Sequence, residues 1–166
     1  MDTTIPPEEE RRWNRLQNLM MNFHGHFKSE FNTLHELADG SYTRRGLSLS
    51  NYLRTASRFV HELTMHHTIE EQYFFPMLAK KMPEFSVNSD AAHMISHAGI
   101  HRGLDDLTAL VRSCQADRTT YSPEKMRECL DSFRDVLFNH LDEEVADLAG
   151  ENLRKHFTLE ELNRLH

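Results

Sequence analysis

Hydrophobic residues recur every three or four positions along four long stretches of the sequence, the spacing of α-helices that bury one face. The first stretch begins after Pro6 and Pro7, because proline is tolerated in the first turn of a helix, and ends at Asp39-Gly40-Ser41. Its apolar stripe consists of Trp13, Leu16, Met20, Phe27, Phe31, Leu34 and Ala38. His24 falls within this stripe, so the pattern predicts a histidine at a core position of the first helix.

The second stretch begins at Ser48 or Ser50, either of which can cap a helix, and ends at Met82-Pro83. Pro76 lies inside it and should bend the helix or begin its final turns, because proline lacks the backbone N–H. Two neighbouring stripes are present, one through Leu63, His66, Glu70, Tyr73 and Met77, the other through Val60, Leu63, His67, Phe74 and Leu78. Periodicity alone does not choose between His66 with Glu70 and His67 with Glu71.

The third stretch begins near Asn88 or Ser89, and its inner face carries His97 and His101 four residues apart. His93, one turn before His97, is a further candidate on the same helix.

The fourth stretch begins at Ser122-Pro123, a capping serine followed by proline at the first helical position. Its inner stripe carries His140 and Glu144, and Gly150 is expected to end it. Thr158 to Glu161 resemble a capping box that opens a short C-terminal helix. The sequence therefore predicts an all-α fold, an up-down-up-down four-helix bundle over about residues 8–150 with a tail helix in 151–166, in one domain spanning 1–166.

Composition narrows the class of protein. The chain has 166 residues, only 6 glycines and 5 prolines, and a formal net charge of −7, which argues against a nucleic-acid-binding protein. The sequence has no apolar run long enough for a transmembrane helix, and Met1–Arg12 has no secretory signal, so we expect a soluble cytoplasmic protein. Cys114 and Cys129 are expected to be thiols, with a disulfide between them as the alternative.

Seven side chains on the inner stripes are candidate metal ligands: His24, His66, Glu70, His97, His101, His140 and Glu144. A carboxylate is rarely buried without a partner, and burying an ion costs several kcal/mol. Two divalent cations would supply the missing positive charge and would hold the imidazoles in their neutral form. The set has too few carboxylates for a ferritin-like site and too many ligands for one tetrahedral zinc ion, so it favours a pair of iron ions.

The order of these residues resembles that of hemerythrin and the wider HHE cation-binding proteins: a histidine, then H-x-x-x-E, then H-x-x-x-H, then a histidine shortly before a carboxylate. The segments HHTIEEQYFFP, HAGIHRGLDDL and HLDEEVADL are most similar to the single-domain hemerythrin-like proteins of fungi, and the resemblance covers roughly residues 10–150. It assigns the seven residues as ligands and favours His66 with Glu70, because the following E-x-x-x-F-P run fits that register. The bridging aspartate of the oxygen carriers corresponds to Val145, so Glu144, or alternatively Glu143, would supply that carboxylate.

The resemblance implies two iron ions joined by an oxo or hydroxo group, with an open position on one of them. The first hypothesis is a protein that binds O2, or senses oxygen or iron, with an apolar lining drawn from Phe23, Phe27, Phe74, Leu104 and Leu137. The second is a di-iron enzyme acting on a small molecule, with His61, His67, Glu71 or Tyr73 as acid–base helpers. A cavity that reaches solvent beside the metals would favour this enzyme hypothesis. The third hypothesis is an interaction module whose fold responds to iron.

Overall fold

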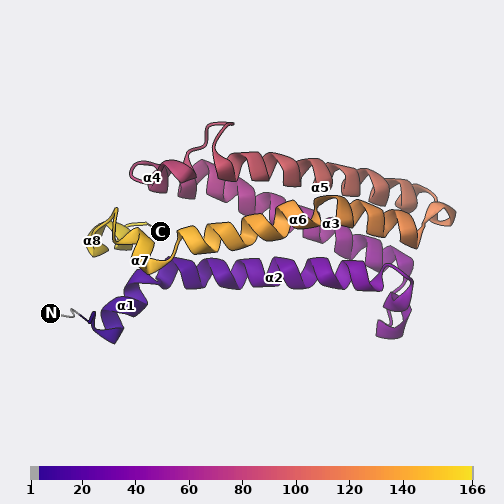
Figure 1. The fold of residues 1–166 in the computed structure, drawn as a ribbon. Helices are drawn as coiled ribbons and strands as arrows, with labels where there is room; N and C mark the ends of the chain where they lie inside the picture. The colour runs from indigo at the N-terminus through magenta and orange to yellow at the C-terminus, as the bar shows by residue number, and fades with distance from the viewer. Residues whose placement is uncertain (1–3, 166) are drawn as a thin grey trace.

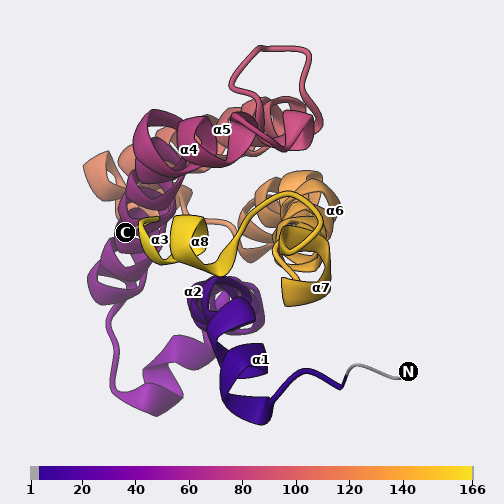
Figure 2. The ribbon, with the colours of Figure 1, turned by 90° about the vertical axis from the view of Figure 1, so that its left-hand side faces the viewer.

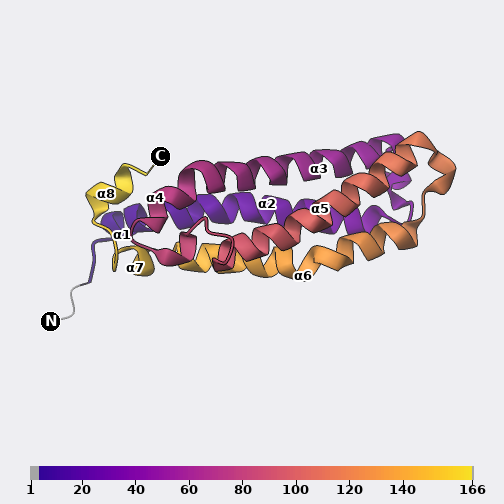
Figure 3. The same cartoon turned by 90° about the horizontal axis from the view of Figure 1, so that it is seen from above.

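The computed structural model describes residues 4–165, so the ends of the predicted domain, 1–3 and 166, lie outside the described residues. Helices and connecting turns make up this part of the chain, and it contains no strand. The four long helices are α2 (Arg15–Leu37), α3 (Leu49–Ile69), α5 (Ala92–Ala116) and α6 (Pro123–Asp147). They lie side by side in Figures 1 and 3, with the closest contacts between α2 and α3, α3 and α5, α5 and α6, and α6 and α2. The all-α class predicted from the sequence is confirmed.

Short elements connect the long helices or lie against one end of them. They are α1 (Pro7–Trp13), η1 (Ser41–Arg45), η2 (Glu70–Phe74), α4 (Phe75–Ala79), η3 (Pro83–Phe85), η4 (Arg118–Thr120), α7 (Gly150–Leu153) and α8 (Leu159–Asn163). Figure 2 looks toward the end of the molecule that carries both chain ends, and α7 and α8 lie in front of the long helices there. No helix in the described part of the chain is long and apolar enough to span a membrane.

Several helix boundaries match the sequence signals. Ser48 and Ser122 are the N-caps of α3 and α6, and each side-chain oxygen accepts a hydrogen bond from a backbone N–H in the first turn. Thr158 and Glu161 form the predicted capping box of α8. The tail is nevertheless two short helices, α7 and α8, where one was expected.

Other boundaries differ from the prediction. The first helix is interrupted at Asn14, and α5 begins at Ala92, beyond both predicted caps. Gly150 begins α7 and does not end α6, which stops at Asp147. The Gly150 N–H donates to Asn14 Oδ1 over 2.9 Å, and a Cβ at this position would lie 2.6 Å from the same oxygen. Close approach of the two segments explains the glycine here, and this tertiary contact could not be inferred from the sequence.

The hydrophobic core consists of two clusters of buried side chains. The distal cluster fills the half of the molecule away from the chain ends and includes Phe31, Phe59, Leu107 and Phe133. The proximal cluster, at the end near the chain termini, includes Trp13, Met20, Phe75, Leu148 and Leu162. Cys114 and Cys129 are both free thiols, with Cys114 inside the distal cluster, as expected.

Gly103 marks the tightest approach of α5 to α6. A Cβ there would lie 2.3 Å from Phe133 Cγ and 2.5 Å from Phe133 Cβ, and the latter atom is too close to the backbone to move aside. We expect Gly103→Ala to lower the free energy of unfolding by about 1–3 kcal/mol through overpacking. Chemical denaturation would measure it.

Gly25 is the matched control, because it also lies inside a long helix and a Cβ added there would have no neighbouring atom within 4 Å. Gly25→Ala should raise stability by roughly 0.5–1 kcal/mol, since alanine favours helix. Similar effects of the two substitutions would contradict the close packing of α5 on α6.

Candidate metal centre

The predicted ligands lie between the two hydrophobic clusters on all four long helices. On α2, for example, His24 lies between Met20 of the proximal cluster and Phe27 of the distal cluster. His24, Glu70, His97, His140 and Glu144 are each at most 2% exposed. The side chain of His66 is 12% exposed, and His101 is partly buried. The structure thus brings six of the seven predicted residues into one chain of contacts, with His101 at its margin.

One group of nitrogen and oxygen atoms comes from α2, α3 and η2. His66 Nε2 lies 2.6 Å from Glu70 Oε1 and 3.2 Å from His24 Nε2. His24 Nε2 lies 4.0 Å from the same Glu70 oxygen. One ligand atom from each of these three residues falls within 4.8 Å of the others, a spacing that could hold a metal ion.

A second group comes mainly from α5 and α6. His97 Nε2 lies 2.9 Å from His140 Nε2 and 3.3 Å from Glu70 Oε2. His67 belongs to the same group by distance, since its ligand atom lies within 4.8 Å of those of Glu70, His97 and His140. Glu70 is the residue that belongs to both of these groups.

Glu144 also lies between the groups. Its Oε2 is 3.7 Å from His24 Nε2 and 3.3 Å from His140 Nε2, and neither carboxylate oxygen has a hydrogen-bond partner among the described residues. No lysine or arginine pairs with Glu70 or Glu144 in the described chain. A buried carboxylate without a partner is strongly unfavourable, so these oxygens fit a bound cation. Glu143, the alternative residue, is exposed.

The two carboxylates differ in proton affinity. Burial alone would raise the pKa of Glu70, but the close imidazole rings of His24, His66 and His97 outweigh it and hold the pKa well below its usual value. Burial, and then the neighbouring charge of Glu70, raise the pKa of Glu144 well above its usual value. A cation between them would favour the ionised form of both.

Three histidines of the site favour the neutral form, which is the form that binds metal. Burial and then His97 lower the pKa of His140 to about 2, and the same two causes lower the pKa values of His67 and His101. His24 Nδ1 lies 2.8 Å from the Leu141 carbonyl oxygen, to which only a protonated nitrogen can donate.

His97 Nδ1 likewise lies 2.7 Å from Glu71 Oε1. These contacts place the ring protons of His24 and His97 on Nδ1 and leave their Nε2 lone pairs facing the centre.

The wide helical turn η2 explains why both registers of the second helix reach the site. In η2 the Phe75 N–H donates to the Glu70 carbonyl five residues earlier, which adds one residue to the turn just before Pro76. Glu70 then faces His66, while Glu71 reaches His97 on α5. A regular 3.6-residue period could not reveal this, and Pro76 was its only sequence signal.

Ring orientation separates His67 from His101. An imidazole binds a metal ion in the plane of its ring. The rings of His67 and His97 stack, with centroids 3.8 Å apart and planes 14° apart, so one ion cannot lie in both planes. The planes of His101 and His140 are inclined by 80° and 83° to that of His97, an orientation that permits shared coordination. His67 Nδ1 lies 3.3 Å from His101 Nε2. His67 thus stacks on the His97 ring and contacts His101, and it is placed to hold both rings in position.

Two contacts of the site were not foreseen. Glu71 was considered as the alternative ligand or an acid–base helper, and it instead contacts His97 Nδ1. His93 was considered as an extra ligand, but its Nε2 lies 2.9 Å from Asp147 Oδ2, and it belongs to neither candidate metal group.

Comparison with known proteins agrees with the geometry. The sequence profile described as "Hemerythrin HHE cation binding domain" matches residues 15–151. The chain belongs to this family. The match spans all four long helices of this hemerythrin domain, and proteins with such domains bind metal ions.

One relative is the "Dimeric xanthone biosynthesis cluster protein R11" of Cryptosporiopsis sp. (strain 8999). It is 29% identical to this hemerythrin domain over 111 residues, which are 66% of this chain and 40% of that protein. The aligned part is thus less than half of the relative's length. No solved structure gives a significant match.

Proposed function

We propose that this chain is a non-haem di-iron protein of 166 residues in one domain, in which the four long helices form an up-down-up-down bundle. His24 and His66 would bind one iron ion, and His97, His101 and His140 the other. Glu70 and Glu144 would contact both ions. The observation that carries the proposal is that each of these carboxylates faces histidine nitrogens of both groups.

The donor set favours iron. Imidazole nitrogens together with carboxylate oxygens suit iron, and five nitrogens exceed what a single zinc site uses. When bound, such a pair of ions supplies the capacity to bind or activate O2. The chain's own part is to hold the imidazoles neutral, to present their Nε2 atoms and to keep water out with the two flanking hydrophobic clusters.

Metal analysis tests the proposal directly. Purified protein should carry about two iron ions per chain, as expected from two ligand groups that share carboxylates. After anaerobic reduction, addition of O2 should produce a charge-transfer band of an oxo-bridged pair. Zinc at one ion per chain, or no metal, would contradict the proposal.

The ring planes lead to a sharper prediction for the second iron. His101→Ala should lose one of the two ions, whereas His67→Phe should keep both, because phenylalanine preserves the stacking on His97 and only a ligand's loss removes metal. Iron per chain, measured for both variants and the parent, checks this. The reverse result would assign the coordinating nitrogen to His67.

A second candidate function is a di-iron enzyme acting on a small molecule, and a specific observation favours it. A cavity of about 590 Å³ lies beside Glu70 and His66, far larger than O2 requires. The name of the fungal relative refers to biosynthesis of a dimeric xanthone, an aromatic compound. Reversible spectral cycling with O2 and no product would favour oxygen binding, whereas O2 consumption that depends on an added small molecule would favour catalysis.

A further inference from the structure

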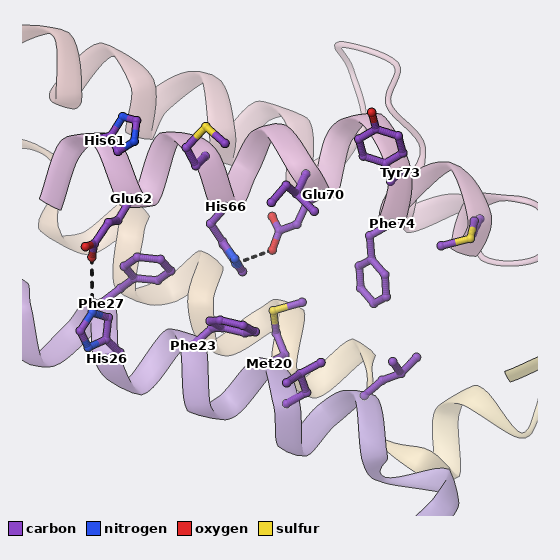
Figure 4. Close-up of a pocket in the computed structure, with 15 residues that line it drawn as sticks. Met20, Phe23, His26, Phe27, His61, Glu62, His66, Glu70, Tyr73 and Phe74 are labelled. Atoms are coloured by element: carbon purple, nitrogen blue, oxygen red, sulfur yellow. Dashed lines mark ion pairs between the residues drawn. The ribbon is translucent and has the colours of Figure 1, made fainter. Parts of the chain in front are cut away.

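The cavity lies between α2 and the segment formed by α3, η2 and α4, and Figure 4 shows its lining. Its volume of about 590 Å³ lies within the range of pockets that hold drug-sized molecules, roughly 300–1,000 Å³. Most of the wall is hydrocarbon, thioether or aromatic ring. The hydrophobic clusters fill the rest of the interior but leave this space beside the candidate metal centre.

Exposed apolar side chains gather at this cavity. Leu19, Phe23, Met65, Ile69 and Tyr73 line it, and between 47% and 65% of each residue's surface is exposed. Scattered exposed apolar residues are ordinary, but a contiguous group around a hollow is typical of a binding site. Because these residues surround a concave space, they suit a ligand that enters it.

The inner wall of the cavity carries polar atoms of the candidate metal centre. Glu70 and His66 both line the cavity, and their ion pair of 2.6 Å faces it in Figure 4. A second polar pair lies toward one end, where His26 Nε2 is 3.5 Å from Glu62 Oε2. The cavity therefore has close polar pairs at two places along a largely apolar wall.

Aromatic rings and methionines form much of the rest of the wall. Phe23, Phe27 and Phe74 line the cavity with Met20 and Met65. Aromatic faces stack on flat ligands, and methionine adapts its shape to them. Phe23, Phe27 and Phe74 were predicted from the sequence as an apolar lining, whereas Leu104 and Leu137 pack in the distal cluster.

We propose that this cavity binds a flat, apolar, multi-ring molecule that carries a phenol or carbonyl oxygen, with that oxygen directed at Glu70 and His66. The direction of the oxygen rests on the proposed function, because it places the reactive end of the molecule at the iron pair. Binding itself depends only on the apolar wall. Samples of this protein that lack iron should therefore still bind the molecule.

Isothermal titration with 2-hydroxyxanthone, a flat three-ring phenol, tests the proposal on the protein as purified, with its iron content measured in parallel. We expect saturable binding of one molecule per chain. Leu19→Arg places a charged side chain at the cavity mouth and should weaken binding by about tenfold or more.

Met21→Arg is the matched control. Met21 lies on the same helix two residues further along and is 52% exposed against 53% for Leu19, but it does not line the cavity. The Met21→Arg variant should bind the phenol with an affinity within about twofold of the parent's, since a surface charge away from the cavity contributes little to binding. Absence of binding to the parent protein, or equal weakening by both variants, would overturn the proposal.

Two further measurements separate this proposal from its alternatives. If sedimentation shows a dimer that Leu19→Arg alone dissociates, and the parent does not bind the phenol, the apolar surface is an interface between copies and the proposal fails. If the protein carries no iron yet binds the phenol in a manner sensitive to Leu19→Arg, the cavity assignment stands and the proposed di-iron function fails.

Discussion

Under the proposed di-iron function, Glu70→Gln should leave the protein folded but unable to hold either ion, because Glu70 supplies a ligand atom to both candidate metal groups. The amide keeps the volume of the side chain and removes its charge. Free metal at about 100 times its Kd stabilises a one-site protein by about 2.7 kcal/mol, and the variant should gain none of this. In a domain of this size that difference corresponds to a rise in Tm of roughly 5–10 °C. Differential scanning calorimetry with and without added iron measures it.

Glu62→Gln is the appropriate comparison. Glu62 lies on α3, as does the candidate ligand His66, but its side chain is 38% exposed and pairs with His26 and Arg58 at the surface. Its iron content and its response to added metal should match those of the parent. Retention of two irons by Glu70→Gln would refute the bridging role.

Glu144→Gln should have opposite effects on the metal-free and metal-loaded proteins. Without metal, Glu144 is a fully buried carboxyl group with no hydrogen-bond partner for either oxygen. At neutral pH the folded chain must keep this carboxyl protonated, so replacing it by the neutral amide should raise the free energy of unfolding of the metal-free protein. With iron, the variant should lose a shared ligand and hence the stabilisation by metal. Chemical denaturation of the parent and of Glu144→Gln, each with a chelator and with iron, gives the four free energies of unfolding required.

The pH dependence of the metal-free proteins provides a second check. Burial raises the pKa of Glu144 above its unfolded value, so the contribution of Glu144 to the stability of the parent falls as pH rises above about 4.5, and this contribution is absent from Glu144→Gln. Burial lowers the pKa values of His67 and His140, so both proteins should lose stability as pH falls below about 6.5.

Between pH 5 and 7 the variant should therefore gain more stability with rising pH than the parent. Parallel profiles would show that Glu144 is not held protonated in the metal-free fold.

Apolar spacing predicted the four long helices and the inward position of the candidate ligands, because helical period and burial are both local properties of the sequence. His24 and His140 lie in the core as their stripes indicated. The choice between His66 and His67 could not be made from the sequence, since both lie on α3 before η2 and both rings contact histidines of the site. The helix is interrupted at Asn14, whose side chain accepts a hydrogen bond from Gly150, more than a hundred residues away in the sequence.

The cavity was also beyond sequence analysis. Phe23 and Phe27 were identified as lining residues, but the space between α2 and α3 depends on how far the two helices separate. Phe27 is 4% exposed and Phe23 is 48% exposed, although both belong to the same wall. The spacing of residues along α2 cannot predict this difference in exposed fraction, because the neighbouring helix α3 determines which of the two rings is covered.

The division of the hydrophobic core has a consequence for how the protein unfolds. Polar residues of the metal centre lie between the proximal cluster and the distal one, and the two clusters are separate groups of buried side chains. Bound ions would be the cross-link that makes the halves melt together. Chelation should then reduce cooperativity as well as Tm, with a calorimetric enthalpy larger than the van't Hoff enthalpy.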